Sequence, residues 1–289
     1  MSSDKILEKV KKLRELTGVG FKDCKNAIEQ NSGDIEKSIE FLRKKGIAKA
    51  NKKMERVAAE GLVCISEKEN TFSIIEINTE TDFAAKNDQF IKFAEELSQL
   101  TLDKSGNMND ILISNMENKK SVKDNLISLI SKIGEKITFR RCDFIGSDKS
   151  VNFSYTHSSL KKNVGKIGVL LSLKTKKKKT ELLDLGKKLT MHIAALSPLS
   201  IDKENLDPKV LEKEKEIITE QLKNTGKDPK IIDKIAIGKL NKFISDNTLL
   251  NQEWIMDPKK KVRDIIKEAD SKDKIEIIKY VRFKVGEGI

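Results

Sequence analysis

The sequence contains few of the residues on which metal, disulfide and acid–base chemistry depend. Among 289 residues there are two histidines and three cysteines. Cys24, Cys64 and Cys142 are odd in number and show no CxxC spacing, which predicts buried thiols in a reducing compartment instead of a disulfide framework. His157 and His192 have neither an HExxH motif nor a cysteine pair beside them. We therefore expect no metal site.

The motifs of nucleotide binding and nucleophilic catalysis are also missing. The sequence contains neither of the glycine-rich phosphate loops GxxxxGKS/T and GxGxxG, and no GxSxG nucleophile elbow. Its carboxylates are dispersed, mostly at helix-surface spacing beside lysines, where ion pairing explains them. We therefore expect no enzyme activity, no cofactor and no direct nucleotide binding.

Signals for membranes and export are absent as well. No apolar run reaches the roughly 18 residues that a transmembrane helix needs. The N-terminus, MSSDKILEKV, has no apolar h-region and no arginine-rich transit pattern. These features predict a cytoplasmic protein without a membrane partner.

The formal net charge of +12 would suit a nucleic acid or an acidic membrane. However, the positive charge is almost all lysine, scattered among Glu and Asp, and arginine, the better reader of phosphates and bases, is scarce. Trp254, Tyr155 and Tyr280 are the only large polar aromatics, so no stacking platform for bases stands out. Solvated lysine faces are favoured over a nucleic-acid partner. A basic RNA- or ribosome-associated binding protein is the alternative.

Residues 1–46 are predicted to form a three-helix domain. Apolar residues recur at i, i+4 and i+7 in its first and last helices, namely Ile6, Val10 and Leu13, and Ile35, Ile39 and Leu42. The glycines of TGVGF break the first helix, and Asp34 is placed to N-cap the third. So small a unit has a thin core and is typical of a docking module. Residues 47–60 are basic with few large apolar side chains, which predicts a solvated linker helix.

The rest of the chain is predicted to be a duplicated α+β core, with one subdomain at 61–145 and the other at 146–289. Each half has paired strands, then helices, then a strand with an R-F or F-R pair (Phe139-Arg140, Arg282-Phe283). Strands are expected at 62–66, 72–78, 137–145, 151–156, 166–174 and 274–288. Helices are expected over Phe90 to Leu97, near 108–117, at 121–133 and at about 180–195.

The second half also contains a long polar helical region at about 208–245. The segment TGKDP (225–229) interrupts it, which predicts an antiparallel helical hairpin. Pro258 is expected to open another short helix.

Four motifs, in order along nearly the whole chain, resemble one family. LRELTGVGFKDCKNAI (13–28), EINTETDFAAKNDQF (76–90), the stretch from YTH to GKIGVLLSL (155–173) and YVRFKVGEGI (280–289) resemble the patterned segments of the bacterial elongation factor Ts family. This resemblance implies a UBA-like N-terminal domain, two α+β subdomains and a helical hairpin that protrudes from the second.

The family resemblance also implies a function. Members are guanine-nucleotide exchange factors that bind GDP-bound elongation factor Tu, accelerate GDP release and are displaced when GTP binds. The expected partner is therefore elongation factor Tu in its GDP-bound and nucleotide-free states. A dimer or heterotetramer through the helical hairpin is left open. A ubiquitin-type docking module on an otherwise structural protein is a further alternative.

By the same resemblance, Thr81, Asp82 and Phe83 would insert near the magnesium and phosphate end of the partner's nucleotide site. Without the resemblance, Asp82 could simply N-cap the helix that follows, and Phe83 could be a core residue. The resemblance favours the partner-binding interpretation.

Four other positions match partner-binding residues of the family. Arg14, Phe21 and Lys22 would dock on the G domain of elongation factor Tu, and His157 would contact it away from the nucleotide. Alternatively, Phe21 belongs to the core of the small domain, Lys22 is merely solvated, and His157 only satisfies a strand edge beside Tyr155.

Overall fold

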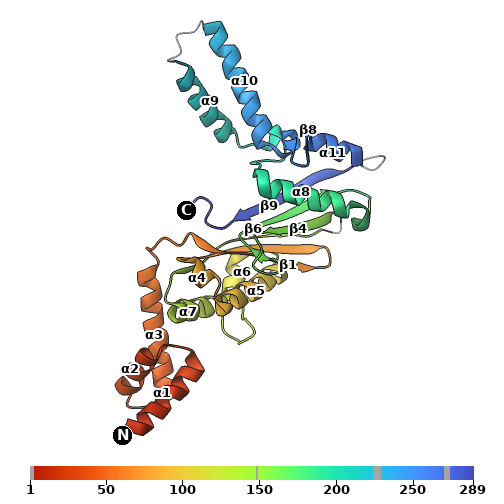
Figure 1. Ribbon diagram of the computed structural model, residues 1–289. Helices are drawn as coiled ribbons and strands as arrows, with labels where there is room; N and C mark the ends of the chain where they lie inside the picture. The colour runs from red at the N-terminus through yellow and green to blue at the C-terminus, as the bar shows by residue number, and fades with distance from the viewer. Residues whose placement is uncertain (1–2, 148, 224–228, 270–273) are drawn as a thin grey trace.

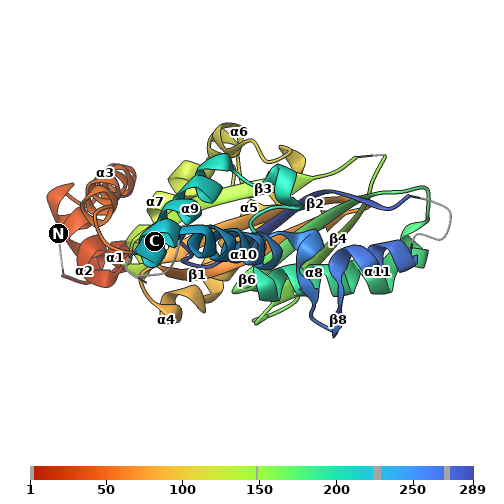
Figure 2. The ribbon, with the colours of Figure 1, turned by 90° about the horizontal axis from the view of Figure 1, so that it is seen from above.

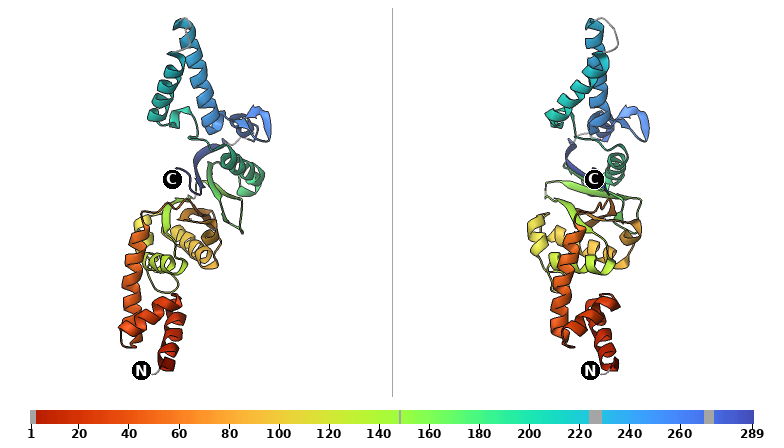
Figure 3. Two further views of the ribbon diagram at one scale, coloured as in Figure 1. Left: turned by 60° about the vertical axis from the view of Figure 1, so that its left-hand side comes forward. Right: turned by 90° about the vertical axis from the view of Figure 1, so that its left-hand side faces the viewer.

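The computed structural model describes residues 3–147, 149–223, 229–269 and 274–289. They form an elongated molecule with a helical unit at the N-terminal end, two stacked sheets covered by helices in the middle, and a pair of helices at the far end (Figure 1). The two side views in Figure 3 show the same order. No helix of the described ranges is long and apolar enough to span a membrane.

The N-terminal unit consists of three helices, α1 (Ser3–Thr17), α2 (Phe21–Gln30) and α3 (Ile35–Lys53). The residues that form its core are Val10, Leu13, Cys24, Ala27, Ile28 and Leu42. Asp34 N-caps α3 as predicted, and its carboxylate accepts a hydrogen bond of 3.0 Å from the backbone N–H of Lys37.

The predicted linker helix at 47–60 is wrong in its extent. Its first residues continue α3 without a break, and the chain from 54 to 59 is not helical. α3 lies against α7 (Val122–Ile133), where a Cβ on Gly46 would come within 2.7 Å of the Ser131 hydroxyl. This close packing and an ion pair of 2.8 Å between Arg43 and Asp124 hold α3 to the core of the protein.

The first sheet has the order β3-β2-β1-β5, and all its pairings are antiparallel. Its strands are β1 (Glu60–Lys68), β2 (Thr71–Thr79), β3 (Ile137–Ile145) and β5 (Val164–Gly165). Successive side chains of a strand face opposite sides, so Leu62 and Cys64 contact the covering helices while Val63 and Ile65 contact the second sheet. Burial on both faces explains the nearly continuous apolar runs in β1 and β2.

Helices cover the outer face of the first sheet. They are α4 (Asp82–Ala85), α5 (Asp88–Asp103), α6 (Met108–Ile113) and α7. The second sheet has the order β4-β6-β9, from strands β4 (Val151–His157), β6 (Ile167–Lys174) and β9 (Glu276–Lys284). Its outer face is covered by α8 (Leu183–Leu196) and α11 (Val262–Ala269).

The inner faces of the two sheets pack on each other. The residues of this layer are Val63, Ile65, Phe72, Ile74, Ile145, Leu170, Val281 and Phe283. The central body is thus a helix, sheet, sheet, helix stack, whose layers follow one another from top to bottom in Figure 1 and overlie one another in the view from above in Figure 2. The fold mixes helix and sheet in the manner expected of an α+β protein.

Pro258 does not open a helix, contrary to the sequence prediction. It lies in β8 (Asp257–Lys261), which pairs with β7 (Glu253–Trp254), and α11 begins only at Val262. In a ribbon of two strands, both are edges, so the missing N–H of a proline is tolerated.

Two helices, α9 (Pro208–Lys223) and α10 (Pro229–Asn247), lie side by side and project from the second half (Figures 1 and 3). The Lys239 ammonium donates a hydrogen bond of 2.8 Å to the side-chain oxygen of Gln221, which joins the two helices. Most of the predicted interruption at 225–229 falls outside the described residues.

A buried carboxylate joins the two sheets. Glu76 on β2 is fully buried and accepts hydrogen bonds from Arg140 Nη1 (3.0 Å), Arg141 Nε (2.6 Å), Asn78 Nδ2 (3.0 Å) and the backbone N–H of Gly286 (2.9 Å). A bulge in the β2–β3 pairing shifts the register between Glu76 and Ile77, so two consecutive arginines reach one carboxylate. Burial raises the pKa of Glu76, but these donors outweigh it, and the pKa lies below its usual value.

We expect Glu76→Gln to reduce the free energy of unfolding by about 2–4 kcal/mol at neutral pH, because it leaves two arginines without their counter-charge. The folded-state pKa of Glu76 is lowered, so its contribution is complete above the unfolded-state value of about 4.3 and is lost as the pH falls through the folded-state value. Urea unfolding of both proteins across an acidic pH series measures this.

Glu69→Gln is the matched control, because Glu69 is exposed in the turn between β1 and β2. If Glu76→Gln destabilised the protein no more than Glu69→Gln, the buried carboxylate would not have the role assigned to it.

Candidate partner-binding site

The segment Thr81-Asp82-Phe83 begins two residues after the end of β2. Thr81 is the N-cap of the single-turn helix α4, with an extended backbone and a hydroxyl that accepts a hydrogen bond of 3.2 Å from Ala84 N–H. The suggestion that Asp82 is the cap is therefore wrong. Asp82 is the first helical residue, and its carboxylate accepts a hydrogen bond of 2.8 Å from Lys86 Nζ. That bond is the main reason why the pKa of Asp82 lies below its usual value.

Phe83 is the most exposed large apolar side chain of the described residues, at 82% of its full exposure. Phenylalanine is ordinarily among the more buried residue types. Its neighbours Ala84 and Ala85 are buried and anchor the turn to the core. Phe83 is thus not a core residue, and its ring is free for contact with another molecule.

A glutamate from a distant part of the chain holds this segment in place. Glu135 Oε2 accepts hydrogen bonds from Thr79 Oγ1 (2.9 Å) and from the backbone N–H groups of Glu80 (3.1 Å) and Thr81 (3.0 Å). Glu135 Oε1 accepts one from Thr81 Oγ1 (2.7 Å). Partial burial raises the pKa of Glu135, but these donors outweigh it and the net shift is downward. No local pattern in the sequence pointed to this residue, because it lies 54 positions from Thr81.

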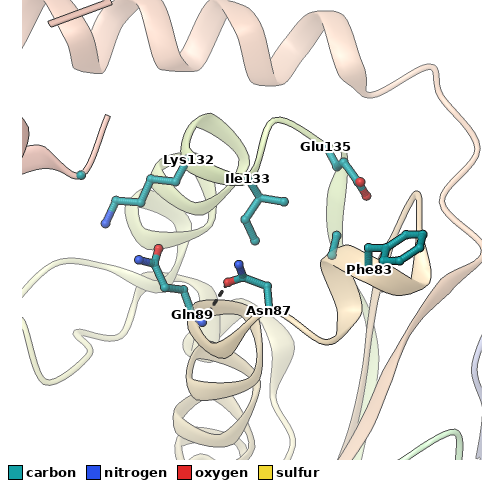
Figure 4. A pocket seen from close by; sticks show the side chains of 8 residues that line it. Phe83, Asn87, Gln89, Lys132, Ile133 and Glu135 are labelled. Carbon is teal, nitrogen blue, oxygen red and sulfur yellow. Dashed lines mark hydrogen bonds between the residues drawn. The ribbon is translucent and has the colours of Figure 1, made fainter. Parts of the chain in front are cut away.

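A shallow depression adjoins Phe83. Its lining residues are Gly18, Phe83, Ala84, Asn87, Gln89, Lys132, Ile133 and Glu135. In Figure 4, Glu135 and Phe83 lie on one side of it, and Lys132 and Gln89 lie on the other. Because Gly18 belongs to the turn after α1, the N-terminal unit borders the same depression.

The three predicted docking residues of the N-terminal unit lie near this turn. Arg14 is in the last turn of α1, and Phe21 and Lys22 begin α2. All three are exposed, and Phe21 retains 43% of its full exposure outside the apolar core of the unit. Phe21 is therefore not a core residue. The exposed position of Lys22 agrees with the alternative that its side chain is simply solvated.

His157 is the last residue of β4, at the edge of the second sheet, and is exposed. Its Nδ1 lies 3.0 Å from the Tyr155 hydroxyl, so the strand-edge contact considered from the sequence is present. Lys166, whose ammonium pairs with Glu60 at 2.6 Å, adjoins His157. Its N–H donates to the carbonyl of His157 at 3.2 Å, and its charge also helps to lower the pKa of Asp82.

The chemistry of the site suits contact with another protein. Together the segment and its surroundings offer an exposed ring, a carboxylate paired with a lysine, and further exposed cations. The described residues contain no group of three or more side chains that could hold a metal ion. All three cysteines are free thiols; Cys24 and Cys64 are buried and Cys142 is partly buried. Burial raises the pKa of Cys64 and that of Cys142 to about 11.

Comparison with known proteins places the chain in a family. The family model described as elongation factor TS matches residues 80–287, and so begins one residue before Thr81. An elongation factor Ts from Parvibaculum lavamentivorans is 39% identical over 283 residues, which are 97% of this chain and 92% of the relative. Those from Gluconobacter oxydans and Rickettsia typhi are 37% and 40% identical, over 97% of this chain and 91% of each relative. The chain therefore belongs to the elongation factor Ts family.

Proposed function

We propose that this protein is a guanine-nucleotide exchange factor that binds elongation factor Tu in its GDP-bound and nucleotide-free states and promotes GDP release during translation elongation. Membership of the elongation factor Ts family supports the activity and the partner. The observation that carries the proposal for the site is the exposed ring of Phe83 on a turn that Thr81 and Glu135 fix.

The Asp82–Phe83 turn would act as a wedge near the magnesium and phosphate end of the partner's nucleotide site. Exchange requires a coupling free energy, so the factor must bind more tightly to the partner with its nucleotide site distorted. Displacing magnesium would remove the charge that neutralises the phosphates of GDP. The wedge is suited to this, because its turn is already formed and loses little conformational freedom on binding.

The wedge alone is too weak to account for a large acceleration. Burying one phenylalanine contributes roughly 1.5–3 kcal/mol, which corresponds to about one to two powers of ten in an equilibrium constant. Further contacts must hold the partner while the turn disturbs its site. Arg14, Phe21 and Lys22 on the N-terminal unit and His157 on the second sheet would supply them.

The same proposal includes the domain organisation. Residues 1–46 would be the UBA-like domain, and the subdomains 61–145 and 146–289 would be the two copies of a duplicated core. Apart from the two-residue β5, the strands of the first sheet come from the first half and those of the second sheet from the second half, and each sheet has its own covering helices, which supports the duplication. α9 and α10 would be the antiparallel hairpin, the element through which a dimer or heterotetramer would form.

We expect Phe83→Ala to slow GDP release from elongation factor Tu by about tenfold or more at a saturating concentration of factor, because the apolar contact that favours the distorted site is lost. Stopped-flow fluorescence with labelled GDP measures the rate. The thermal unfolding of the variant should be unchanged, since the ring contributes little to the core.

Ile113→Ala is the control for loss of an exposed apolar side chain, because Ile113 at the end of α6 retains 75% of its full exposure. An unchanged rate with Phe83→Ala would show that the wedge assignment is wrong.

We expect Arg14→Ala to weaken the complex with elongation factor Tu by about tenfold, about 1.4 kcal/mol, through loss of a docking cation. Titration calorimetry with nucleotide-free partner measures the dissociation constant. Lys12→Ala, which removes an exposed cation from the same helix, should have little effect. Equal affinities for the wild-type protein and Arg14→Ala would contradict the docking role.

A further inference from the structure

We infer that Glu135 is the positioning residue of the exchange wedge, so that its carboxylate determines where Asp82 and Phe83 stand. The inference rests on the proposed function. The wedge has little structure of its own to hold it, because α4 is only four residues long. A single helical turn is unstable without outside contacts, since its few internal hydrogen bonds do not compensate for the loss of chain entropy.

Glu135 supplies such outside contacts to the chain that leads into α4. Three consecutive residues, Thr79, Glu80 and Thr81, donate four hydrogen bonds to its two carboxylate oxygens. Hydrogen bonds to a charged acceptor are shorter and stronger than those between neutral groups. Two of these donors are backbone N–H groups, so the bonds fix the main chain that leads into the wedge as well as its side chains.

The position of Glu135 is itself closely determined. It lies in the turn between α7 and β3, and the preceding residue, Gly134, ends α7 in the left-handed conformation (φ 85°). The next residue, Lys136, donates its N–H to Glu80 Oε1 at 2.6 Å. Each side therefore binds the other, since Glu80 N–H donates to Glu135 and Lys136 N–H donates to Glu80. Such a reciprocal pair leaves little freedom for the end of β2 to shift relative to this turn.

The chain that leaves the N-terminal unit holds the same turn. Lys53, the last residue of α3, donates its ammonium to the carbonyl of Gly134. Lys136 Nζ donates to the carbonyls of Met54 and Arg56, each at 2.7 Å. The Arg56 guanidinium also lies 3.2 Å from both carboxylate oxygens of Glu80. The turn that presents Glu135 is thus fixed to the docking unit on one side and to the wedge on the other.

The test compares Glu135→Ala and Glu135→Gln with wild-type protein. Alanine removes all four acceptor contacts. Glutamine can keep its carbonyl oxygen at the Oε2 position, where three of the four donors converge, and place its amide group toward the Thr81 hydroxyl. We therefore expect a large effect from alanine and substantial rescue by glutamine.

Two measurements separate positioning from general destabilisation. Amide hydrogen exchange of residues 79–85 in the free protein should accelerate in Glu135→Ala, while the strands of the second sheet keep their protection. The maximal rate of GDP release should fall roughly tenfold, while the factor concentration that gives half of this rate changes much less. Glu117→Ala, which removes an exposed carboxylate from the loop between α6 and α7, should leave both readouts unchanged.

The outcomes distinguish this inference from the proposal on which it rests. If Phe83→Ala slows release but Glu135→Ala does not, or if exchange at 79–85 is unchanged, the positioning role is wrong. If Phe83→Ala has no effect, the wedge itself is wrong, whatever Glu135→Ala does. If Glu135→Ala fails to fold, Thr79→Val removes a single donor and should give a smaller shift of both readouts in the same direction. No shift would overturn the inference.

Discussion

The ion cluster around Glu76 is the interaction on which the arrangement of the two sheets depends. A fully buried carboxylate is stable only when donors surround it, and here they come from Asn78 on β2 itself, from β3 and from the backbone after β9. Arg140 and Arg141 also donate to the carbonyls of Glu287 and Lys284, so the end of the chain is held against the first sheet. This end of the chain directly follows β9, the last strand of the second sheet. The cluster therefore fixes the two halves as one body.

The same pair of strands carries the proposed binding site. β2 contains Glu76 and leads within a few residues to Thr81, and β3 contains the two arginines and begins just after Glu135. The last pair in their ladder, Thr79 with Ile137, brings the ends of both strands together, so that Glu135 meets the segment it binds. An exposed phenylalanine is thus presented by a rigid part of the fold, and its freedom is limited before any partner arrives.

The sequence predicted those features of the fold that depend on local pattern. Apolar runs predicted every strand of both sheets except the two-residue β5, and the neighbours of Thr81 placed it after a strand, although Asp82 and Phe83 already belong to the short helix α4. Contacts between distant residues could not be predicted in this way. Glu135 is one glutamate among many until the β2–β3 register places it, and nothing local distinguishes the exposed Phe83 from the buried Phe90 or Phe93. Pro258 was misassigned because a helix start and an edge strand both tolerate a proline.

The continuous course of α3 determines how the two ends of the proposed binding surface are related. A flexible linker would let the N-terminal unit find its contact at many distances and angles, and its length could change at little cost. A continuous helix allows neither this freedom of placement nor a change in length at little cost. One residue inserted into α3 before its contact with α7 would turn the N-terminal unit by about 100° and move it by about 1.5 Å. The number of residues in α3 is therefore as important to binding as the identity of any contact residue. This requirement concerns the whole helix, so it cannot be seen in any one of its side chains.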